Sequence, residues 1–224
     1  MTVATRLHPE HLPRRMAIVV FLAFALAYFF SALVRAITAT LSPTLTREFA
    51  LSAQDLGLLA GGYFLGFSLT QLPLGRWLDK QGPKKVILAF LTFAVLGCLA
   101  FSWADSFQGL LAARVLCGMG VSACLMAPLT GYRRWFDAST QLRTNSWMLM
   151  TGSLGMLAAT LPVQWLMPIW GWRALFVVLG VMIALAMLLI ALVVPRWQQA
   201  VTAAGAPQAP AADDDGSYRQ IWRS

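Results

Sequence analysis

The chain has 224 residues, of which 58% are hydrophobic and 12% are charged, and its formal net charge is +8 at neutral pH. A soluble globular domain is about half apolar and about a quarter charged, so the composition excludes an ordinary soluble domain. The apolar residues form six runs, each long enough for a helix that needs about 20 residues to cross a lipid bilayer. We therefore predict a polytopic integral membrane protein.

The expected fold is an all-α membrane protein with six transmembrane helices. Strands are not expected, because an unpaired backbone in lipid allows only helices or closed barrels, and these runs are continuous rather than alternating. The first run is too long for a signal peptide and is expected to be retained. Residues 1–15 are predicted to form an N-terminal tail and residues 16–194 the six-helix bundle. The predicted spans, in chain order, are Met16–Ala39, Asp55–Trp77, Val86–Ser102, Phe107–Leu129, Asn145–Met167 and Ala174–Val194.

Basic residues predict how the bundle is oriented. Most of the 17 Lys and Arg residues fall in the two tails and in alternate loops: Arg6, Arg14, Arg15, Arg76, Lys80, Lys84, Lys85, Arg133, Arg134, Arg143, Arg196, Arg219 and Arg223. The positive-inside rule then places both termini in the cytoplasm, in a membrane of the bacterial inner (plasma) type. Topology explains the net charge, and no nucleic-acid partner is needed.

Metal and cofactor chemistry is not expected. Cys98, Cys117 and Cys124 lie within predicted spans without zinc-site spacing, so we interpret them as packing residues and predict no disulfide. Both histidines, His8 and His11, lie in the N-terminal tail, which excludes a histidine-based metal or catalytic site within the bundle. We predict no metal and no cofactor.

The composition changes after the last run. Residues 195–224 include a segment rich in Ala, Pro and Gln, followed by Asp213, Asp214 and Asp215, which predicts a flexible cytoplasmic linker. The last residues, 218–224, resemble the start of another element. We therefore expect the chain to be truncated, one half of something larger.

The segment between the second and third runs, Gly75-Arg-Trp-Leu-Asp79-Lys80-Gln-Gly82-Pro-Lys84-Lys85, has the most specific pattern. Glycines permit a tight turn, the aspartate can pair with a cation, and the lysines favour the anionic leaflet. It resembles the cytoplasmic loop motif of the major facilitator superfamily, from which it departs at Trp77, Leu78 and Pro83.

In that superfamily the Gly and Asp of this motif lie against the other half of the transporter and stabilise its outward-facing state. The resemblance implies a gating loop here, in which Gly75 and Asp79 have these roles. It also implies that Gly82 is the turn residue and that the lysines at 80, 84 and 85 are charge partners. The alternative is a basic loop that sets topology and has no gating role.

Two further segments resemble the same superfamily. Arg114, with Gly118 and Gly120, matches the Arg-x-x-x-Gly-x-Gly pattern of its fourth helix, where the arginine makes the cavity polar and in some members couples protons. A membrane-embedded arginine by default marks a pathway, although carbonyl groups could satisfy it for stability alone. Residues 171–176, Gly-Trp-Arg-Ala-Leu-Phe, match the entry to the sixth helix, where an interfacial tryptophan and a snorkelling arginine are an equal explanation.

Arg35 carries the prediction about the solute. Arg35 with Tyr28 fits the first span of several anion-transporting branches of the superfamily, and no Asp or Glu lies clearly inside a span. A cavity lined by Arg35 and Arg114 favours an organic anion, because the guanidinium group matches carboxylate and phosphate. Pairing with a carboxylate of the missing half is an equal alternative. The other expected cavity residues are Tyr28, Tyr63 and Gln71.

The resemblance implies a secondary active transporter, a symporter or antiporter, that moves a small solute by alternating access. Such a bundle has two inverted three-helix repeats and needs a second six-helix bundle, which is either the missing C-terminal half or another subunit. The alternative is a non-transporting scaffold or regulatory half. An intramembrane serine protease is disfavoured, because Ser153 has no His or Lys in any span to act as its base.

Overall fold

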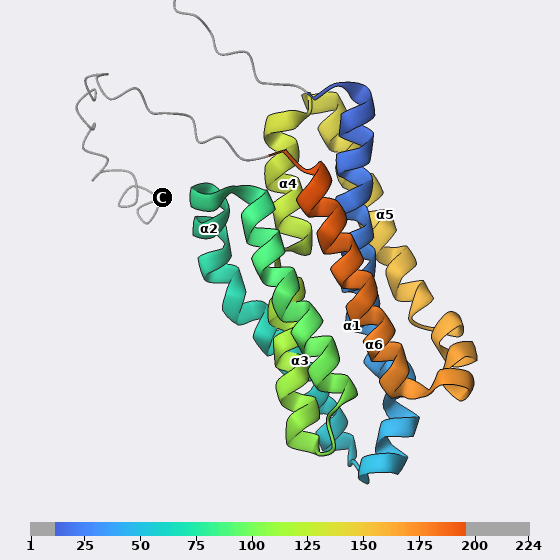
Figure 1. Ribbon diagram of the computed structural model, residues 1–224. Helices are drawn as coiled ribbons and strands as arrows, with labels where there is room; N and C mark the ends of the chain where they lie inside the picture. Colours follow the sequence, from blue (N-terminus) through green and yellow to red (C-terminus); the bar gives the residue numbers. More distant parts are fainter. Residues whose placement is uncertain (1–11, 196–224) are drawn as a thin grey trace, which may run out of the picture.

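The computed structural model describes residues 12–195. The two tails beyond them, including both histidines and most of the predicted linker, lie outside the described residues. The described chain forms α1 (Arg14–Phe49), α2 (Ala53–Ser102), α3 (Phe107–Val121), α4 (Ala123–Trp135), α5 (Ala138–Ala158) and α6 (Leu161–Val193). Figure 1 shows these helices packed lengthwise in an elongated bundle. The predicted all-helical class is confirmed.

Four helical stretches of the described chain are long and apolar enough to cross a membrane: α1, α2, α3 together with α4 as far as Arg133, and α6. They do not correspond one to one with the predicted runs. The second and third runs both lie in α2, which consists of two helical limbs. The backbone reverses between these limbs at Gly82 (φ 78°, ψ 164°). Figure 1 shows the two limbs of α2 side by side. A positive φ of this kind is accessible to glycine and costly for other residues, so Gly82 is the turn residue, as predicted.

The first predicted span ends too early. α1 does not stop at Ala39 but continues through Pro43 to Phe49. Proline cannot donate to the carbonyl four residues before it, and the hydroxyl of Ser42 supplies that hydrogen bond instead, at 2.8 Å from the oxygen of Ala39. The helix therefore passes the proline without losing a hydrogen-bond partner at this carbonyl.

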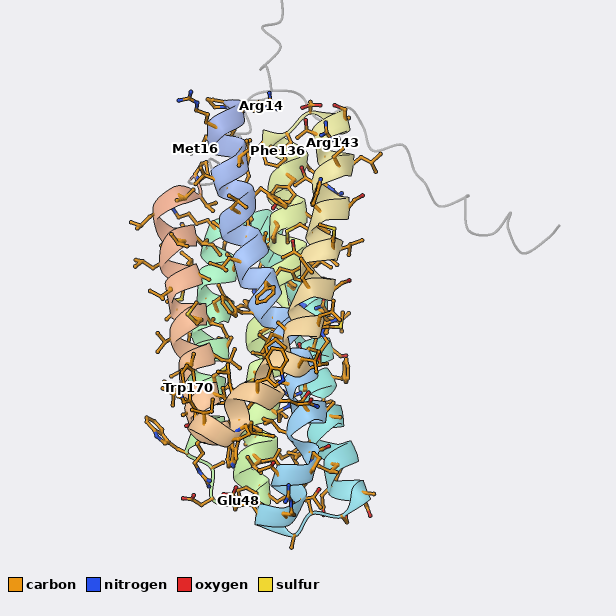
Figure 2. The ribbon with its side chains drawn as sticks, turned by 90° about the vertical axis from the view of Figure 1, so that its right-hand side faces the viewer. Arg14, Met16, Glu48, Phe136, Arg143 and Trp170 are labelled. Carbon is orange, nitrogen blue, oxygen red and sulfur yellow. The ribbon has the colours of Figure 1, made fainter. Side chains whose placement is uncertain are left out.

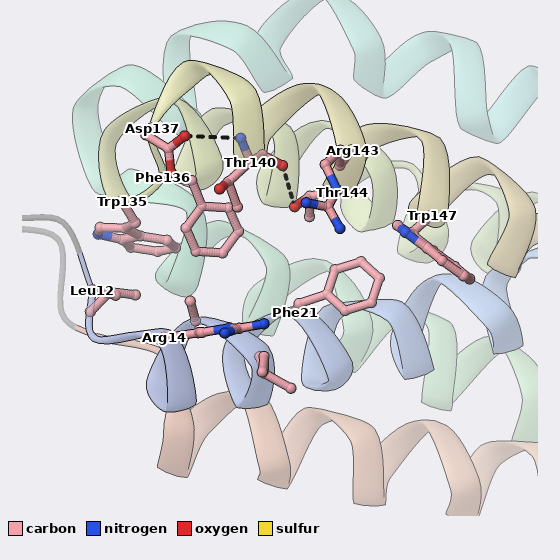
Figure 3. A pocket seen from close by; sticks show the side chains of 12 residues that line it. Leu12, Arg14, Phe21, Trp135, Phe136, Asp137, Thr140, Arg143, Thr144 and Trp147 are labelled. Atoms are coloured by element: carbon pink, nitrogen blue, oxygen red, sulfur yellow. Dashed lines mark hydrogen bonds between the residues drawn. The ribbon is translucent and has the colours of Figure 1, made fainter.

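The fifth predicted span, Asn145–Met167, begins too late. α5 begins at Ala138, because the carboxylate of Asp137 caps it by accepting from the backbone N–H of Thr140 at 3.1 Å (Figure 3). The hydrogen bonds from Ser139 and Thr140 lower the pKa of this carboxyl below its ordinary value. α5 ends at Ala158 and the helix resumes at Leu161, in the first limb of α6. The backbone then turns at Gly171 (φ 73°, ψ 161°), as it does at Gly82, so the predicted end at Met167 lies close to this turn. A hydropathy run detects neither a cap nor a bend.

The two ends of the bundle differ in charge. Arg14, at the start of α1, and Arg143, near the start of α5, lie at one end, whereas Glu48 and Trp170 lie at the other (Figure 2). The Gly82 turn lies at the same end as Arg14 (Figure 1). We call this the basic end and the opposite one the far end. The basic loops of the described chain thus gather where the sequence predicted a common side.

The core depends on two close helix contacts. Where α2 meets α3, a Cβ atom at Gly66 would lie 2.1 Å from the carbonyl oxygen of Val115, and one at Gly118 would lie 2.0 Å from that of Tyr63. Where α1 meets α5, a Cβ at Gly155 would lie 2.3 Å from the carbonyl oxygen of Phe29. Glycine at these positions lets the backbones touch.

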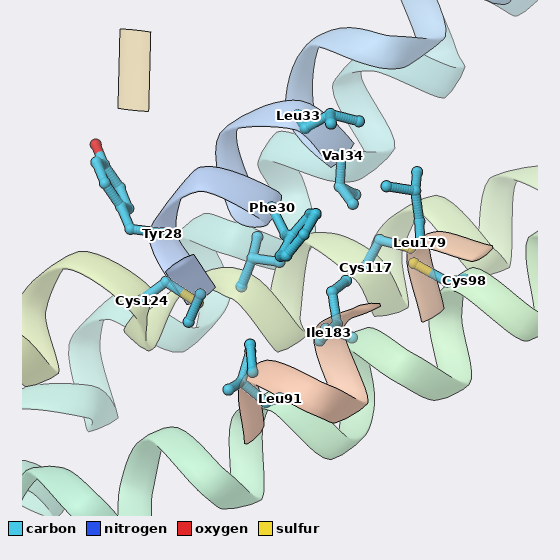
Figure 4. Packing of buried hydrophobic residues seen from close by; sticks show 14 of the residues in the cluster. Tyr28, Phe30, Leu33, Val34, Leu91, Cys98, Cys117, Cys124, Leu179 and Ile183 are labelled. Carbon is cyan, nitrogen blue, oxygen red and sulfur yellow. The ribbon is translucent and has the colours of Figure 1, made fainter. Parts of the chain in front are cut away.

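Between these contacts lies a continuous buried cluster that includes Val34, Cys98, Cys117 and Ile183 (Figure 4). All three cysteines of the chain are buried and free, which agrees with their interpretation as packing residues. Helices α1, α2, α3 and α6 all contribute to this cluster, so it joins the α1–α5 and α2–α3 contacts into one core.

Candidate functional site

Arg114 lies at the centre of the bundle on α3, with only 1% of its surface exposed. Its Nη1 donates to the carbonyl oxygen of Val34 at 2.9 Å, and its Nη2 donates to that of Arg35 at 3.5 Å. The guanidinium carbon lies 4.7 Å from the centre of the Tyr63 ring, within the range of a cation–π contact. Two neighbouring helices thus hold this arginine, α1 through main-chain oxygens and α2 through an aromatic face.

Arg35 lies on the turn of α1 whose carbonyls hold Arg114. Its side chain is partly exposed, its guanidinium carbon lies 5.9 Å from the centre of the Phe67 ring, and its buried Nε has no hydrogen-bond partner in the described chain. Within residues 12–195 neither arginine forms an ion pair. Two positive charges therefore lie near each other in the bundle without an acidic neighbour.

The predicted tyrosines lie close to this pair. Tyr63 is buried beneath Arg114, and its hydroxyl interacts with the side chain of Arg35. Tyr28 packs on α5, where a Cβ added at Gly152 would lie 2.5 Å from its ring. The structure thus brings four of the five predicted cavity residues to the middle of the bundle.

Gln71 lies elsewhere. Its Nε2 donates to the carbonyl oxygen of Ser122 at 3.5 Å, at the junction of α3 and α4. It also lines a cavity of about 250 Å³ between α2 and α4, together with Gly75, Asp79 and Arg133. Gln71 therefore belongs with the predicted gating loop rather than with Arg35.

The gating-loop residues differ in their surroundings. Nothing lies within 4 Å of a Cβ added at Gly75, and Asp79 is exposed at the edge of the α2–α4 cavity. Lys84 donates from Nζ to the carbonyl oxygen of Val194 at 2.6 Å, where it caps the C-terminal end of α6. Lys80 and Lys85 are exposed. Sequence reasoning missed Arg133, whose position on α4 opposite Asp79 depends on how the helices pack.

A polar cluster joins three segments at the far end. Glu48, in the last turn of α1, accepts a hydrogen bond from Nε1 of Trp172 at 2.6 Å and forms an ion pair with Arg173. Arg173 also contacts Asp105, between α2 and α3, at 3.3 Å. Trp172 is only 4% exposed, so its predicted role as a membrane-interface anchor is wrong.

Residues 24–224 match the sequence profile of the Major Facilitator Superfamily. The chain belongs to this superfamily. The solved structure of a bacterial homologue of the human lysosomal transporter Spinster, in an inward-facing and unoccupied conformation, has a TM-score of 0.75 and 19% identity. That match covers 94% of this chain and 49% of the other. The family predicted from the three motifs is confirmed, and so is its type of fold.

Curated relatives in the superfamily are similar over about two thirds of this chain. The probable L-galactonate transporter of Escherichia coli K12 is 26% identical over 141 residues, which are 62% of this chain and 31% of that protein. The hexuronate transporter of the same strain is 28% identical over 151 residues, 66% of this chain and 34% of that protein. The niacin transporter of Acinetobacter baylyi is 28% identical over 155 residues, 69% and 35% respectively. The chain spans about a third of the length of these relatives.

Proposed function

We propose that the chain is the N-terminal bundle of a secondary active transporter that moves a small organic anion by alternating access, as a symporter or antiporter. The observation that carries the proposal is the pair of arginines, Arg35 and Arg114, within the bundle and without an acidic partner in the described chain. A charge in this position is costly unless a function or a partner requires it. Arg35 is the group offered to the solute, because carbonyl oxygens already engage Arg114.

The relatives support an anionic solute. Their names specify galactonate, hexuronate and niacin, and another similar protein is the 4-hydroxybenzoate transporter of Pseudomonas aeruginosa. Each of these solutes carries a carboxylate, which accepts two parallel hydrogen bonds from a guanidinium group. Family and relatives together indicate a transporter rather than an enzyme, and they do not favour a scaffold that transports nothing.

Transport by rocking requires a second bundle, and the gating loop offers a surface for it. The space beside Gly75 is open, and Asp79 with Arg133 borders the adjoining cavity. We propose that the second bundle contacts this surface and that Asp79 stabilises the state closed at the basic end. Lys84, which caps α6, holds the Gly82 turn against the bundle that it belongs to.

The test of the solute site is Arg35→Lys in the transporter that contains this bundle. Lysine keeps the charge but loses the planar fork, so uptake of a carboxylate should fall by about tenfold to a hundredfold at low solute concentration. Labelled galactonate, galacturonate, niacin and 4-hydroxybenzoate are the probes. Arg47→Lys is the control, since Arg47 is exposed near the far end of the same helix, and should leave uptake unchanged. Equal uptake by Arg35→Lys and the parent would refute the site.

We also propose six membrane crossings in two inverted three-helix repeats, with the basic end and both termini in the cytoplasm. The gathering of basic loops at one end supports this topology. The native cysteines are buried, so single added cysteines can report on each end. Gln81→Cys and Ala138→Cys should react with an impermeant maleimide only after the membrane is opened, and Gln54→Cys and Trp170→Cys, at the far end, should react in intact cells. Labelling of Ala138→Cys and Trp170→Cys from one side would mean that the chain between them does not cross.

A further inference from the structure

A second charged cavity lies at the basic end, away from Arg35. It measures about 460 Å³ and lies between the first turns of α1, the end of α4 and the start of α5 (Figure 3). Ala17 and Phe21 line it from α1, Trp135 and Phe136 from α4 and its C-terminal cap, and Trp147 from α5. Its walls are therefore mainly aromatic and aliphatic.

Two arginines enter this cavity from opposite helices. Figure 3 shows Arg14 of α1 and Arg143 of α5 directed into the space between those helices. The carboxylate in the lining belongs to Asp137, whose Oδ2 already accepts from Ser139 and from the backbone N–H of Thr140. Within the described chain neither arginine forms an ion pair. The cavity thus combines an apolar wall with two arginines and one carboxylate, so the net charge of its lining is positive.

The cavity opens toward the outside of the bundle. Ile18 and Trp147, which both line it, are 51% and 54% exposed, so apolar surface continues from the wall of the cavity to the outer face of α1 and α5. Tryptophan and arginine at the end of a membrane helix lie at the depth of lipid headgroups. A ligand that carries both an anionic group and an apolar chain matches this arrangement better than a small hydrophilic anion.

We propose that this cavity binds the headgroup of an anionic phospholipid, with the phosphate between Arg14 and Arg143 and the acyl chains over Ile18 and Trp147. Basic pockets between membrane helices recognise such headgroups on the cytoplasmic side. Because the lipid bridges α1 and α5, it stabilises the packing of these two helices at the basic end. The binding site does not depend on transport, and only the identity of the leaflet rests on the proposed orientation.

The experiment is native mass spectrometry of the full chain in detergent, titrated with phosphatidylglycerol or phosphatidylcholine. The parent should bind one phosphatidylglycerol in preference to phosphatidylcholine. The Arg14→Gln/Arg143→Gln variant should bind that lipid about thirtyfold more weakly, since each basic residue near the surface contributes about fivefold. Both side chains are exposed, so the substitutions leave the core unchanged.

The matched control is Arg15→Gln/Arg76→Gln, which removes the same charge at the basic end but outside the cavity, and it should keep the parent affinity. An equal loss in this control would mean attraction by net charge and would overturn the site. Ala17→Trp, which fills the cavity and keeps both arginines, should also abolish the preference. Displacement of the lipid by inorganic phosphate or galacturonate at equal concentration would show a site for soluble anions and would contradict the proposal.

Discussion

Arg114 shows how a single buried charge can be held without a carboxylate. Its hydrogen bonds go to the main chain of α1, whose carbonyls already accept within the helix, and its planar face lies on Tyr63. This arrangement spreads the charge over dipoles that cannot move away. The same contacts link α1, α2 and α3, so they offset the free-energy cost of burying the charge.

We predict that Arg114→Lys lowers the free energy of unfolding by about 2 kcal/mol, from the loss of one charge-assisted hydrogen bond and the stacking contact. Unfolding can be followed with a maleimide dye, because Cys98, Cys117 and Cys124 are buried in the native state and react when it opens. Arg47→Lys, an exposed site on α1, should melt like the parent. A variant at position 114 as stable as the parent would mean that the contacts to Val34 and Tyr63 contribute nothing.

Residue chemistry was only partly predictable from the sequence. The burial of Arg114 followed from its position within an apolar run, but its acceptors are carbonyl groups, which every residue carries and no pattern distinguishes. Trp172 was misplaced for a related reason, since interfacial tryptophans are common near helix ends and its partner Glu48 is distant in sequence. Gln71 was grouped with Arg35 because both are polar residues in apolar runs.

At the scale of elements, the contact between α2 and α3 depends on glycine. At Gly66 an added Cβ would overlap the carbonyl of Val115, which belongs to a helix backbone and cannot rotate away. Gly61 lies on the same helix with nothing within 4 Å of its Cβ position. The two glycines therefore form a matched pair for one substitution.

We predict that Gly66→Ala lowers the free energy of unfolding by about 2–3 kcal/mol, as overpacking of a tight contact does. Gly61→Ala should leave stability unchanged or raise it by up to about 1 kcal/mol, because alanine is the better helix former. Thermal melting of the purified chain, read by the same dye, compares them directly. If both variants melted alike, the close approach of Gly66 to the carbonyl of Val115 would have no energetic consequence.

The sequence was informative about elements through hydropathy and misleading about their ends. Long apolar runs located the helices, and Gly82 was identified as the turn. The ends depend on side-chain hydrogen bonds that hydropathy does not include. The Ser42 hydroxyl bonds the carbonyl that Pro43 leaves without a donor, so α1 continues, and the Asp137 carboxylate caps α5 before the predicted start of the span. The Asp137 signal was present in the sequence, since Asp followed by a helical segment is a typical N-cap.

At the scale of the whole molecule, the two ends of the described bundle differ in their ion pairs. The far end is joined by Glu48, Arg173 and Asp105, which connect three segments of the same bundle. At the basic end, Asp79 forms no ion pair within the described residues and borders an open cavity. The ion pairs of the far end therefore lie within the bundle, whereas Asp79 remains available for the contact with a second bundle that we propose.

This difference leads to a prediction for gating in the transporter that contains the chain. If Asp79 stabilises the state closed at the basic end, Asp79→Asn should shift the population toward the state that is open there. A reporter Thr130→Cys, in the lining of the same cavity, should then react about fivefold faster with a maleimide applied from the cytoplasmic side, as expected when an interaction of about 1 kcal/mol is lost. Asp79→Glu, which keeps the charge, should retain most of the parent rate. An unchanged rate in Asp79→Asn would remove Asp79 from the gate and leave the loop only its role in setting topology.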